Sequence, residues 1–298
     1  AERLGIRLFG DLPIYVAHDS ADVWVRQDLF ALDAEGRATA VAGVPPDYFS
    51  ATGQRWGNPL YRWDRLEAEG YAWWVERVRA NLGRCDLLRV DHFRGFAGYW
   101  EIPGEAETAI EGRWVEGPGV RLFDALRAAL GDLPLVAEDL GHITPDVHDL
   151  RRSLAMPGMR VLQFAFDGSP DNPHLPGRHE PDCAVYTGTH DNDTVRGWFD
   201  ALDEGTRRRV LEETGGTPET VSWDLIRAAY GSVGFLAVAP LQDVLGLGGE
   251  ARFNVPGVAE GNWTWRAEAE ALRPETALRL AALAREASRG PAAGPSRS

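Results

Sequence analysis

The sequence predicts an α/β protein whose strands close into a (β/α)₈ TIM-type barrel. Apolar runs of strand length alternate with helix-like segments, as in a parallel sheet covered on both faces. Acidic residues stand at the C-terminal tips of several runs, which is how a barrel builds its site and favours that fold. The runs lie at residues 6–16, 85–93, 133–141, 159–168, 183–193 and 233–243. The acidic tip residues are Asp11, Asp91, Glu138, Asp167 and Asp191.

The segments between these runs carry amphipathic patterns of helical period. They lie at residues 65–82, 120–130, 144–154 and 224–230. The third opens with Thr144 and Pro145, a helix-start signal. The first run contains "FGDLP", which is not the glycine fingerprint of a dinucleotide-binding open sheet. A doubly wound sheet is therefore the less favoured alternative.

Six strand units are visible where a (β/α)₈ barrel needs eight. We therefore expect this chain to lack the first two strands of the barrel, and a missing N-terminal segment to be one of its partners. Residues 1–266 are expected to form the C-terminal portion of the barrel. Residues 267–287 are expected to form a C-terminal helix, and residues 288–298 a disordered tail.

Composition narrows the classes of function. The formal charge of −14 argues against nucleic-acid and anionic-membrane partners, and no apolar run reaches the ~18 residues of a membrane span. Two cysteines, Cys85 and Cys183, do not make a disulfide framework, so we expect a reducing, cytoplasmic location. All 31 basic residues are arginine, which excludes chemistry that needs lysine, including Schiff bases, pyridoxal phosphate and the P-loop.

The stretch "LLRVDHFRG" at residues 87–95 places charge at the tip of an apolar strand. Arg89 and Asp91 are two residues apart, so their side chains leave the same face of the strand. A guanidinium beside a carboxylate keeps it ionised, which suits a nucleophile. A purely structural Arg–Asp pair is the alternative.

Glu138 ends the next apolar run, "LPLVAEDLG". A carboxyl group in a pocket near another acid tends to have a raised pKa and can donate a proton. Asp139 is the rival for that role, and a helix N-terminal acid is the structural alternative.

The stretch "TGTHDNDT" at residues 187–194 places His190 and Asp191 at a third strand tip. A helix follows, and Asn192 or Asp193 could serve as its N-cap. The N-cap interpretation leaves the His–Asp pair unexplained. Two carboxylates across a scissile bond are what glycoside chemistry needs, and a third could support the transition state.

The segment "PPDYFSATGQRWGNPLY" at residues 45–61 is interpreted as a loop rich in Pro and Gly that follows the first strand. It holds aromatic and amide side chains with no periodicity that would bury them. Such residues above a barrel mouth are typical substrate contacts. They are Asp47, Tyr48, Phe49, Gln54 and Trp56.

Six motifs in this order resemble those of the 4-α-glucanotransferases, the amylomaltase or disproportionating-enzyme family, which is glycoside hydrolase family 77 of the α-amylase clan. The motifs are "GDLPIYVAHDSADVW", "GVPPDYFSATGQRWGNPLYRW", "LLRVDHFRGF", "VAEDLGHITPDV", "YTGTHDNDT" and "NVPGVAEGNWTWR". The resemblance runs from about residue 5 to residue 266, and six long motifs in one order make it specific.

The resemblance implies a (β/α)₈ barrel and a role for each matching residue. Asp91 would be the nucleophile, Glu138 the general acid/base and Asp191 the transition-state stabiliser. Arg89 would set the charge state of Asp91, while His92 and His190 would bind the sugar at the cleaved bond. The other positions that look like substrate-binding ones are Asp11, Asp47, Tyr48, Gln54, Trp56 and Asp139.

The resemblance also implies the reaction: retaining transfer of α-1,4-glucan segments between malto-oligosaccharides by double displacement, within carbohydrate metabolism. Its partners would be malto-oligosaccharides, amylose, and glucans derived from starch or glycogen, and it needs no metal or organic cofactor. The 45–61 segment matches the family's loop over the cleft, which favours glucan acceptors over water.

Three alternatives stay open. An α-glucan hydrolase of the same clan would use water as acceptor, and a product ladder would distinguish it. A metal-dependent barrel hydrolase would also place His and Asp at strand tips, but the first strand has no H-x-H and no lysine could form a bridging carbamate. The chain could also be an inactive glucan-binding fragment.

Overall fold

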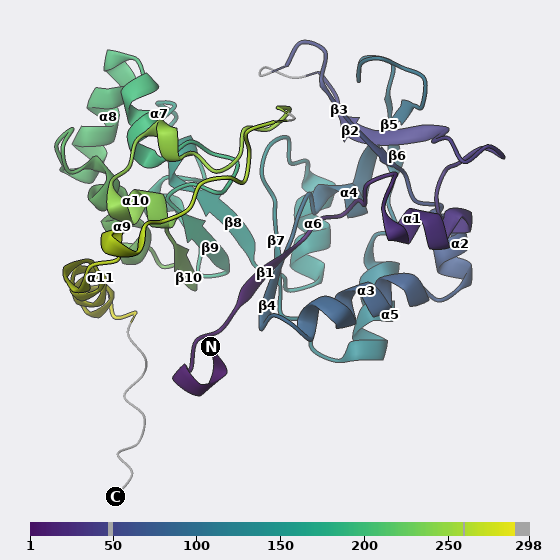
Figure 1. Cartoon of the computed structure of the whole chain (residues 1–298), viewed down its shortest axis with the longest axis horizontal. Coiled ribbons are helices and arrows are strands. Elements are labelled where there is room, and N and C mark those ends of the chain that lie inside the picture. Colours follow the sequence, from purple (N-terminus) through teal and green to yellow (C-terminus); the bar gives the residue numbers. More distant parts are fainter. Residues whose placement is uncertain (47–49, 259, 290–298) are drawn as a thin grey trace, which may run out of the picture. The chain divides into compact units, whose positions relative to one another are not determined.

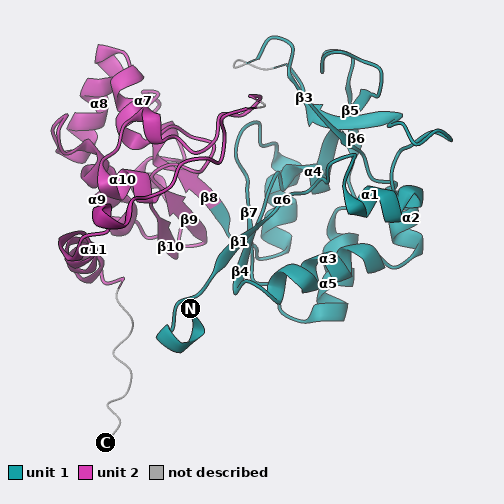
Figure 2. Ribbon diagram, viewed as in Figure 1, with its two compact units in different colours: residues 1–158 teal, residues 159–298 magenta. Residues whose placement is uncertain are grey.

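The computed structural model describes residues 1–46, 50–258 and 260–289. The chain divides into two compact units, residues 1–158 and residues 159–298 (Figure 2). The division falls inside the 1–266 range for which the sequence predicts one barrel portion. Each unit has its own three-stranded sheet and its own core.

Unit 1 is built on a three-stranded sheet of order β1-β4-β7 (Figure 1). The strands are β1 (Phe9–Leu12), β4 (Leu87–Val90) and β7 (Leu135–Ala137), and both pairings are parallel. All of β7 and most of β4 are buried, as expected for parallel strands covered on both faces. The register sets Asp11 opposite Arg89, and Arg89 opposite Val136. The charged residues Asp11 and Arg89 therefore lie side by side near the C-terminal ends of their strands.

The helices of unit 1 follow from their apolar spacing and their start signals. In α5 the buried residues Leu122, Phe123 and Leu126 form one face, and α5 packs against α3. Pro145 begins α6 after Thr144, at the position predicted from the sequence. The helices are α1 (Ala21–Val25), α2 (Trp63–Ala68), α3 (Ala72–Leu82), α4 (Arg94–Ala97), α5 (Val120–Leu130) and α6 (Pro145–Ser153).

The single helix predicted over residues 65–82 is wrong, because the structure breaks it into α2 and α3. Gly70 and Tyr71 lie between the two helices with φ of 61° and 56°. This left-handed backbone cannot continue a right-handed helix. The apolar pattern runs on across the break, which is why periodicity alone did not reveal it.

Unit 1 also contains an antiparallel sheet of order β3-β2-β5-β6. Its strands are β2 (Ala40–Val44), β3 (Gln54–Pro59), β5 (Gly98–Pro103) and β6 (Arg113–Glu116). The interpretation of residues 45–61 as a loop is therefore wrong for residues 54–59, which pair with β2. The burial of β3 does not alternate along the strand, so it lacks the period of two that reveals a strand in a sequence.

Unit 2 is built on a three-stranded sheet of order β10-β9-β8, in which β9 and β10 pair in parallel. The strands are β8 (Gly158–Val161), β9 (Cys183–Tyr186) and β10 (Leu236–Val238). The helices are α7 (Val195–Ala201), α8 (Glu204–Thr214), α9 (Val221–Gly231), α10 (Leu241–Leu245) and α11 (Pro274–Glu286). The core joins Val185 of the sheet to Phe199 of α7, Val210 of α8 and Leu225 of α9.

Each of the six predicted apolar runs contains a strand, and the mixed α/β class is confirmed. Closure of the strands into a (β/α)₈ barrel stays a prediction. The helix expected over residues 267–287 corresponds to the short turn Ala269–Ala271 followed by α11. Of the predicted tail, residues 290–298 lie outside the described residues. No helix within the described ranges is long and apolar enough to cross a membrane.

Candidate active site

Near the C-terminal ends of β1 and β4, the guanidinium of Arg89 binds two carboxylates, those of Asp11 and Asp91. Arg89 donates through Nε and one terminal nitrogen to the two carboxylate oxygens of Asp11, each at 3.1 Å. The same terminal nitrogen lies 2.6 Å from Oδ1 of Asp91. The Arg89 side chain is buried, whereas both carboxylates are partly accessible. The cation therefore stabilises negative charge on Asp91 at the surface of the site.

Glu138 follows β7, at the next strand tip. Its Oε2 accepts a hydrogen bond of 2.7 Å from the backbone N–H of His92, and its Oε1 accepts one of 2.9 Å from the N–H of Leu140. The first bond ties Glu138 to the residue directly after Asp91. The two acids that the sequence singles out in unit 1 are therefore brought together by neighbouring strands.

The environment of Glu138 differs from that of Asp91. The pKa of Glu138 is raised to about 7: burial is the largest cause and the negative charge of Asp91 the second, while Arg89 and the two backbone N–H groups act in the opposite direction. One carboxyl group is thus protonated near neutral pH beside another that is stabilised as an anion. This division of charge is what an acid and a nucleophile acting together require.

The raised pKa of Glu138 makes a prediction about stability. Since the folded pKa, about 7, exceeds the ordinary value of 4.5 for a glutamate, Glu138 stabilises the fold fully below about pH 4.5 and loses that contribution as the pH rises through about 7. In Glu138→Gln the amide nitrogen cannot accept one of the two backbone N–H bonds, and this cost is the same at both pH values. We therefore expect the Tm of the variant, relative to that of the parent, to be about 3 °C higher at pH 8 than near pH 4.5. Differential scanning calorimetry at both pH values measures this.

The matched control for that experiment is Glu107→Gln, which alters an exposed carboxyl group in the loop between β5 and β6. It should leave Tm unchanged at both pH values. A Tm difference between Glu138→Gln and the parent that is the same at both pH values would show that the Glu138 carboxylate carries no burial penalty.

Three rings in unit 1, those of Tyr15, Trp56 and His92, form a group that we call the aromatic wall, and His92 directly follows Asp91 in the sequence. The Trp56 ring meets the His92 ring edge-to-face at 4.7 Å between centroids and also lies 6.3 Å from Tyr15. Gln54 accepts a hydrogen bond of 3.1 Å from the indole Nε1 of Trp56. Strand β3 thus carries Gln54 and Trp56 to the site, and Trp56 remains 38% exposed. A sugar ring could pack on an indole placed in this way.

His92 has unusual backbone and electrostatic features. Its φ is 49°, which is uncommon for a residue other than glycine. Burial and, to a smaller extent, the positive charge of Arg94 together lower the pKa of His92 to about 3. The imidazole is therefore neutral at physiological pH and can offer one donor and one acceptor to a ligand.

Asp139 is placed differently from the other predicted binding residues. Its carboxylate is buried in unit 1, 3.4 Å from the Arg151 guanidinium, with side-chain exposures of 1% and 2%. Gly158 packs so closely that an added Cβ would lie 2.5 Å from the carboxylate. This geometry favours Glu138 over Asp139 as the proton donor, and contact of Asp139 with a sugar would require the ion pair to rearrange. Asp47 and Tyr48 lie outside the described residues.

In unit 2, the predicted site residues His190 and Asp191 contact each other in the loop after β9. Nε2 of His190 lies 3.3 Å from Oδ2 of Asp191, and the His190 ring packs against Trp263 with 5.3 Å between centroids. Asn254 donates to Oδ1 of Asp191 at 2.6 Å. Both carboxylate oxygens thus have fixed partners, which restricts the orientation of Asp191.

Sequence reasoning missed the contribution of Arg252 and Asn254. Arg252 donates to the backbone oxygen of Asp191 at 2.8 Å and to that of Asn254 at 2.9 Å, so it joins the two segments. The stretch "NVPG" begins at Asn254 and opens the last of the six motifs, so it is a signal in the sequence for Asn254, whereas Arg252 lies outside that motif.

The suggested N-caps of the helix after Asp191 are wrong. Thr194 is the N-cap of α7, because its hydroxyl accepts from the N–H of Gly197 at 3.0 Å. Asn192 instead accepts from the N–H of Thr189 at 2.9 Å and closes the turn that presents Asp191. Asp193 accepts from the N–H of Thr194 at 2.7 Å. The polar residues of this stretch therefore shape a loop before the helix begins.

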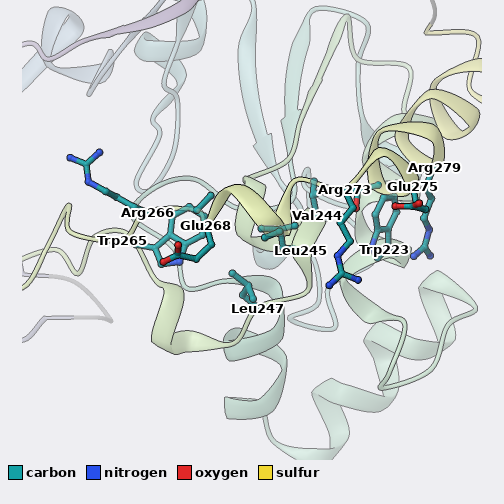
Figure 3. Close-up of a pocket in the computed structure, with 13 residues that line it drawn as sticks. Trp223, Val244, Leu245, Leu247, Trp265, Arg266, Glu268, Arg273, Glu275 and Arg279 are labelled. Carbon is teal, nitrogen blue, oxygen red and sulfur yellow. The ribbon is translucent and has the colours of Figure 1, made fainter.

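A separate groove of about 520 Å³ lies in unit 2. Figure 3 shows Trp223 beside Arg279 at one end and Trp265 beside Glu268 at the other. The Arg279 guanidinium lies 3.8 Å from the centre of the Trp223 ring. No predicted site residue that the structure describes lines this groove. Within the described residues, no three His, Cys, Asp or Glu side chains gather into a group that could hold a metal ion.

The fold of this chain is that of solved amylomaltase structures. The fold matches the amylomaltase of Streptococcus agalactiae, solved in complex with acarbose, with a TM-score of 0.94 and 36% identity over 97% of this chain and 59% of that one. The amylomaltase of Corynebacterium glutamicum, at 21% identity and a TM-score of 0.73, shows the same fold. A family model described as 4-alpha-glucanotransferase matches residues 1–271. The chain belongs to this family, glycoside hydrolase family 77.

Curated relatives carry the same description. A 4-alpha-glucanotransferase of Thermus thermophilus is 53% identical over 95% of this chain and 58% of its own length. One from Synechocystis is 55% identical over 89% of this chain and 54% of its own length. The chain thus spans a little more than half the length of these relatives.

Proposed function

We propose that this chain carries the catalytic carboxylates of a retaining 4-α-glucanotransferase, which transfers α-1,4-glucan segments between malto-oligosaccharides. The observation that carries the proposal is the division of charge in unit 1. Arg89 stabilises Asp91 as an anion, while the pKa of Glu138 is raised to about 7. A nucleophile and a proton donor thus stand at neighbouring strand tips, as double displacement at a glycosidic bond requires.

In the first step Glu138 donates its proton to the glycosidic oxygen as the bond to the anomeric carbon breaks. Asp91 attacks that carbon from the opposite side and forms a β-glycosyl-enzyme ester, and the leaving glucan departs with a new hydroxyl group. Glu138 is then ionised and held by the N–H groups of His92 and Leu140. These donors limit the cost of the new charge.

In the second step the 4-hydroxyl of an acceptor glucan approaches the ester. Glu138 takes the proton of that hydroxyl, the oxygen attacks the anomeric carbon, and Asp91 leaves as a carboxylate. Two inversions restore the α configuration. Arg89 remains beside Asp91 throughout and receives the carboxylate when it is released.

The proposed role of Asp191 is to stabilise positive charge that develops on the sugar ring in both transition states. His92 and His190 would hydrogen-bond the sugar at the cleaved bond, and Asp11, Gln54 and Trp56 would contact the glucan. Asp47, Tyr48 and Asp139 complete the proposed set of binding residues.

Transfer to sugar is favoured over hydrolysis by the aromatic wall of unit 1. Trp56 is partly exposed and packs on His92, the residue next to the proposed nucleophile. An acceptor glucan that covers this surface would exclude water from the glycosyl-enzyme. We propose amylose and starch- or glycogen-derived glucans as substrates, and a cytoplasmic role in carbohydrate metabolism.

The proposal is tested by incubating the chain with maltotriose in a chelator and separating the products by chromatography. The expected result is glucose together with maltopentaose and longer glucans, unchanged by the chelator because no step uses a metal. Glucose and maltose alone would indicate hydrolysis. No product would contradict the proposed activity for this chain, and a product ladder lost in chelator would contradict the mechanism.

A further inference from the structure

Asp243, on α10, is a buried carboxylate that the proposed mechanism does not use. It is 0% exposed, and it lies outside the six motifs that carry the family resemblance. Its Oδ2 accepts a hydrogen bond of 2.6 Å from the hydroxyl of Thr187, and its Oδ1 accepts one of 2.7 Å from the backbone N–H of Val195. The carboxylate therefore reaches two residues that are eight positions apart in the sequence.

Those two residues are the ends of the loop that carries His190 and Asp191. Thr187 follows the last residue of β9, and Val195 is the first residue of α7. Between them the loop is closed by its own polar side chains, because Asn192 accepts from Thr189 and Asp193 accepts from Thr194. These local bonds give the loop its shape, whereas Asp243 fixes both ends of that shape to α10.

The chemistry at this position requires a carboxylate. Two donors converge on it, one hydroxyl and one helix N-terminal N–H, and an ionised carboxylate can accept both at once. Burial raises the pKa of Asp243, the nearby Asp193 charge also raises it, and the two hydrogen bonds oppose these effects. A buried carboxylate is costly unless its partners are in place. Its presence beneath the loop is explained if the loop must be held in one conformation.

We propose that Asp243 is a positioning residue for Asp191: by bonding both ends of loop 187–195 it holds Asp191 in the orientation in which it meets the substrate. The inference rests on the proposed function in one respect, because the role of Asp191 in transfer comes from there. The structural part, that Asp243 immobilises the loop, stands independently of that role.

The first variant is Asp243→Asn, which keeps size and shape but leaves one acceptor oxygen for two donors. The second is Thr187→Val, which removes a single donor and retains Asp243. Asp224→Asn is the matched control: Asp224 is also buried in unit 2, at 7% exposed, and accepts from a threonine hydroxyl, Thr220, at 2.5 Å. It lies on α9 and has no hydrogen bond to loop 187–195 within the described residues.

Hydrogen–deuterium exchange on the full chain is the first measurement, because it does not depend on activity. We expect Asp243→Asn and Thr187→Val to speed the exchange of loop amides 188–195 by at least about fivefold, since local opening governs exchange. Asp224→Asn should leave these amides unchanged. Unchanged loop exchange in both test variants would overturn the proposal, whatever the activity of the chain.

Kinetics with maltotriose form the second measurement. We expect both test variants to lower kcat about tenfold with KM within about twofold, because a misoriented Asp191 weakens transition-state stabilisation more than substrate binding. Asp224→Asn should keep the parent kcat. Faster loop exchange with unchanged kcat would overturn the link to Asp191. A parent chain without transfer activity would overturn the proposed function and leave the exchange result to decide the structural claim.

Discussion

Asp91→Asn is expected to lower kcat for maltotriose disproportionation by at least about 10⁴-fold, because an amide cannot form the glycosyl ester. Arg89 would keep its bidentate contact with Asp11, so the site should retain its shape. KM should therefore change little. Steady-state kinetics, together with circular dichroism to verify folding, measures the effect.

The matched control for that variant is Asp86→Asn. Asp86 immediately precedes β4 and accepts a hydrogen bond of 2.7 Å from the N–H of Leu8, so the change alters a carboxylate near the opposite end of the same strand. It should lower kcat by no more than about twofold. A folded Asp91→Asn chain with more than a tenth of the parent rate would exclude Asp91 as the nucleophile.

The second large effect is expected from Glu138→Gln, and its size should depend on the leaving group. With maltotriose the departing oxygen needs a proton, so kcat should fall by about 10³-fold. With α-maltosyl fluoride as donor the fluoride ion leaves without one. The glycosylation step should then keep most of its rate, which stopped-flow measurement of fluoride release would show as a burst.

The burst distinguishes an acid/base residue from one that only shapes the site. If Glu138→Gln slowed fluoride release as strongly as it slowed maltotriose cleavage, its role would not be proton transfer. Parent activity should also fall as the pH rises through about 7, the pKa of Glu138, because the donor is then ionised. A rate with maltotriose that stayed constant from pH 6 to about 9 would contradict this assignment.

The sequence was sufficient to predict what depends on neighbouring positions along one strand. Arg89 and Asp91 share a face because they are two residues apart, and their hydrogen bond follows from that. The apolar runs also marked the strands, most clearly where the strand is buried along its whole length, as in β7, β8 and β9. These features depend on residues close together in the sequence, so they can be predicted without knowledge of the fold.

The contacts that could not be predicted join residues far apart in the chain. The pairing of Arg89 with Asp11 spans 78 residues and follows from the register of β1 with β4. The bond from Asn254 to Asp191 spans 63 residues. Strand β3 is defined by its partner β2, and its burial does not alternate. Without the fold, no pattern in the sequence connects these positions.

The double attachment of Arg89 has a consequence for the whole reaction cycle. In the proposed glycosyl-enzyme the charge of Asp91 disappears into a neutral ester, and a buried guanidinium that relied on Asp91 alone would be left without a counter-ion. Asp11 remains bonded to Arg89 through both of its oxygens. Arg89 therefore keeps Asp11 as its counter-ion when the covalent intermediate forms. The neighbouring strand thus lowers the electrostatic difference between the resting enzyme and its covalent state.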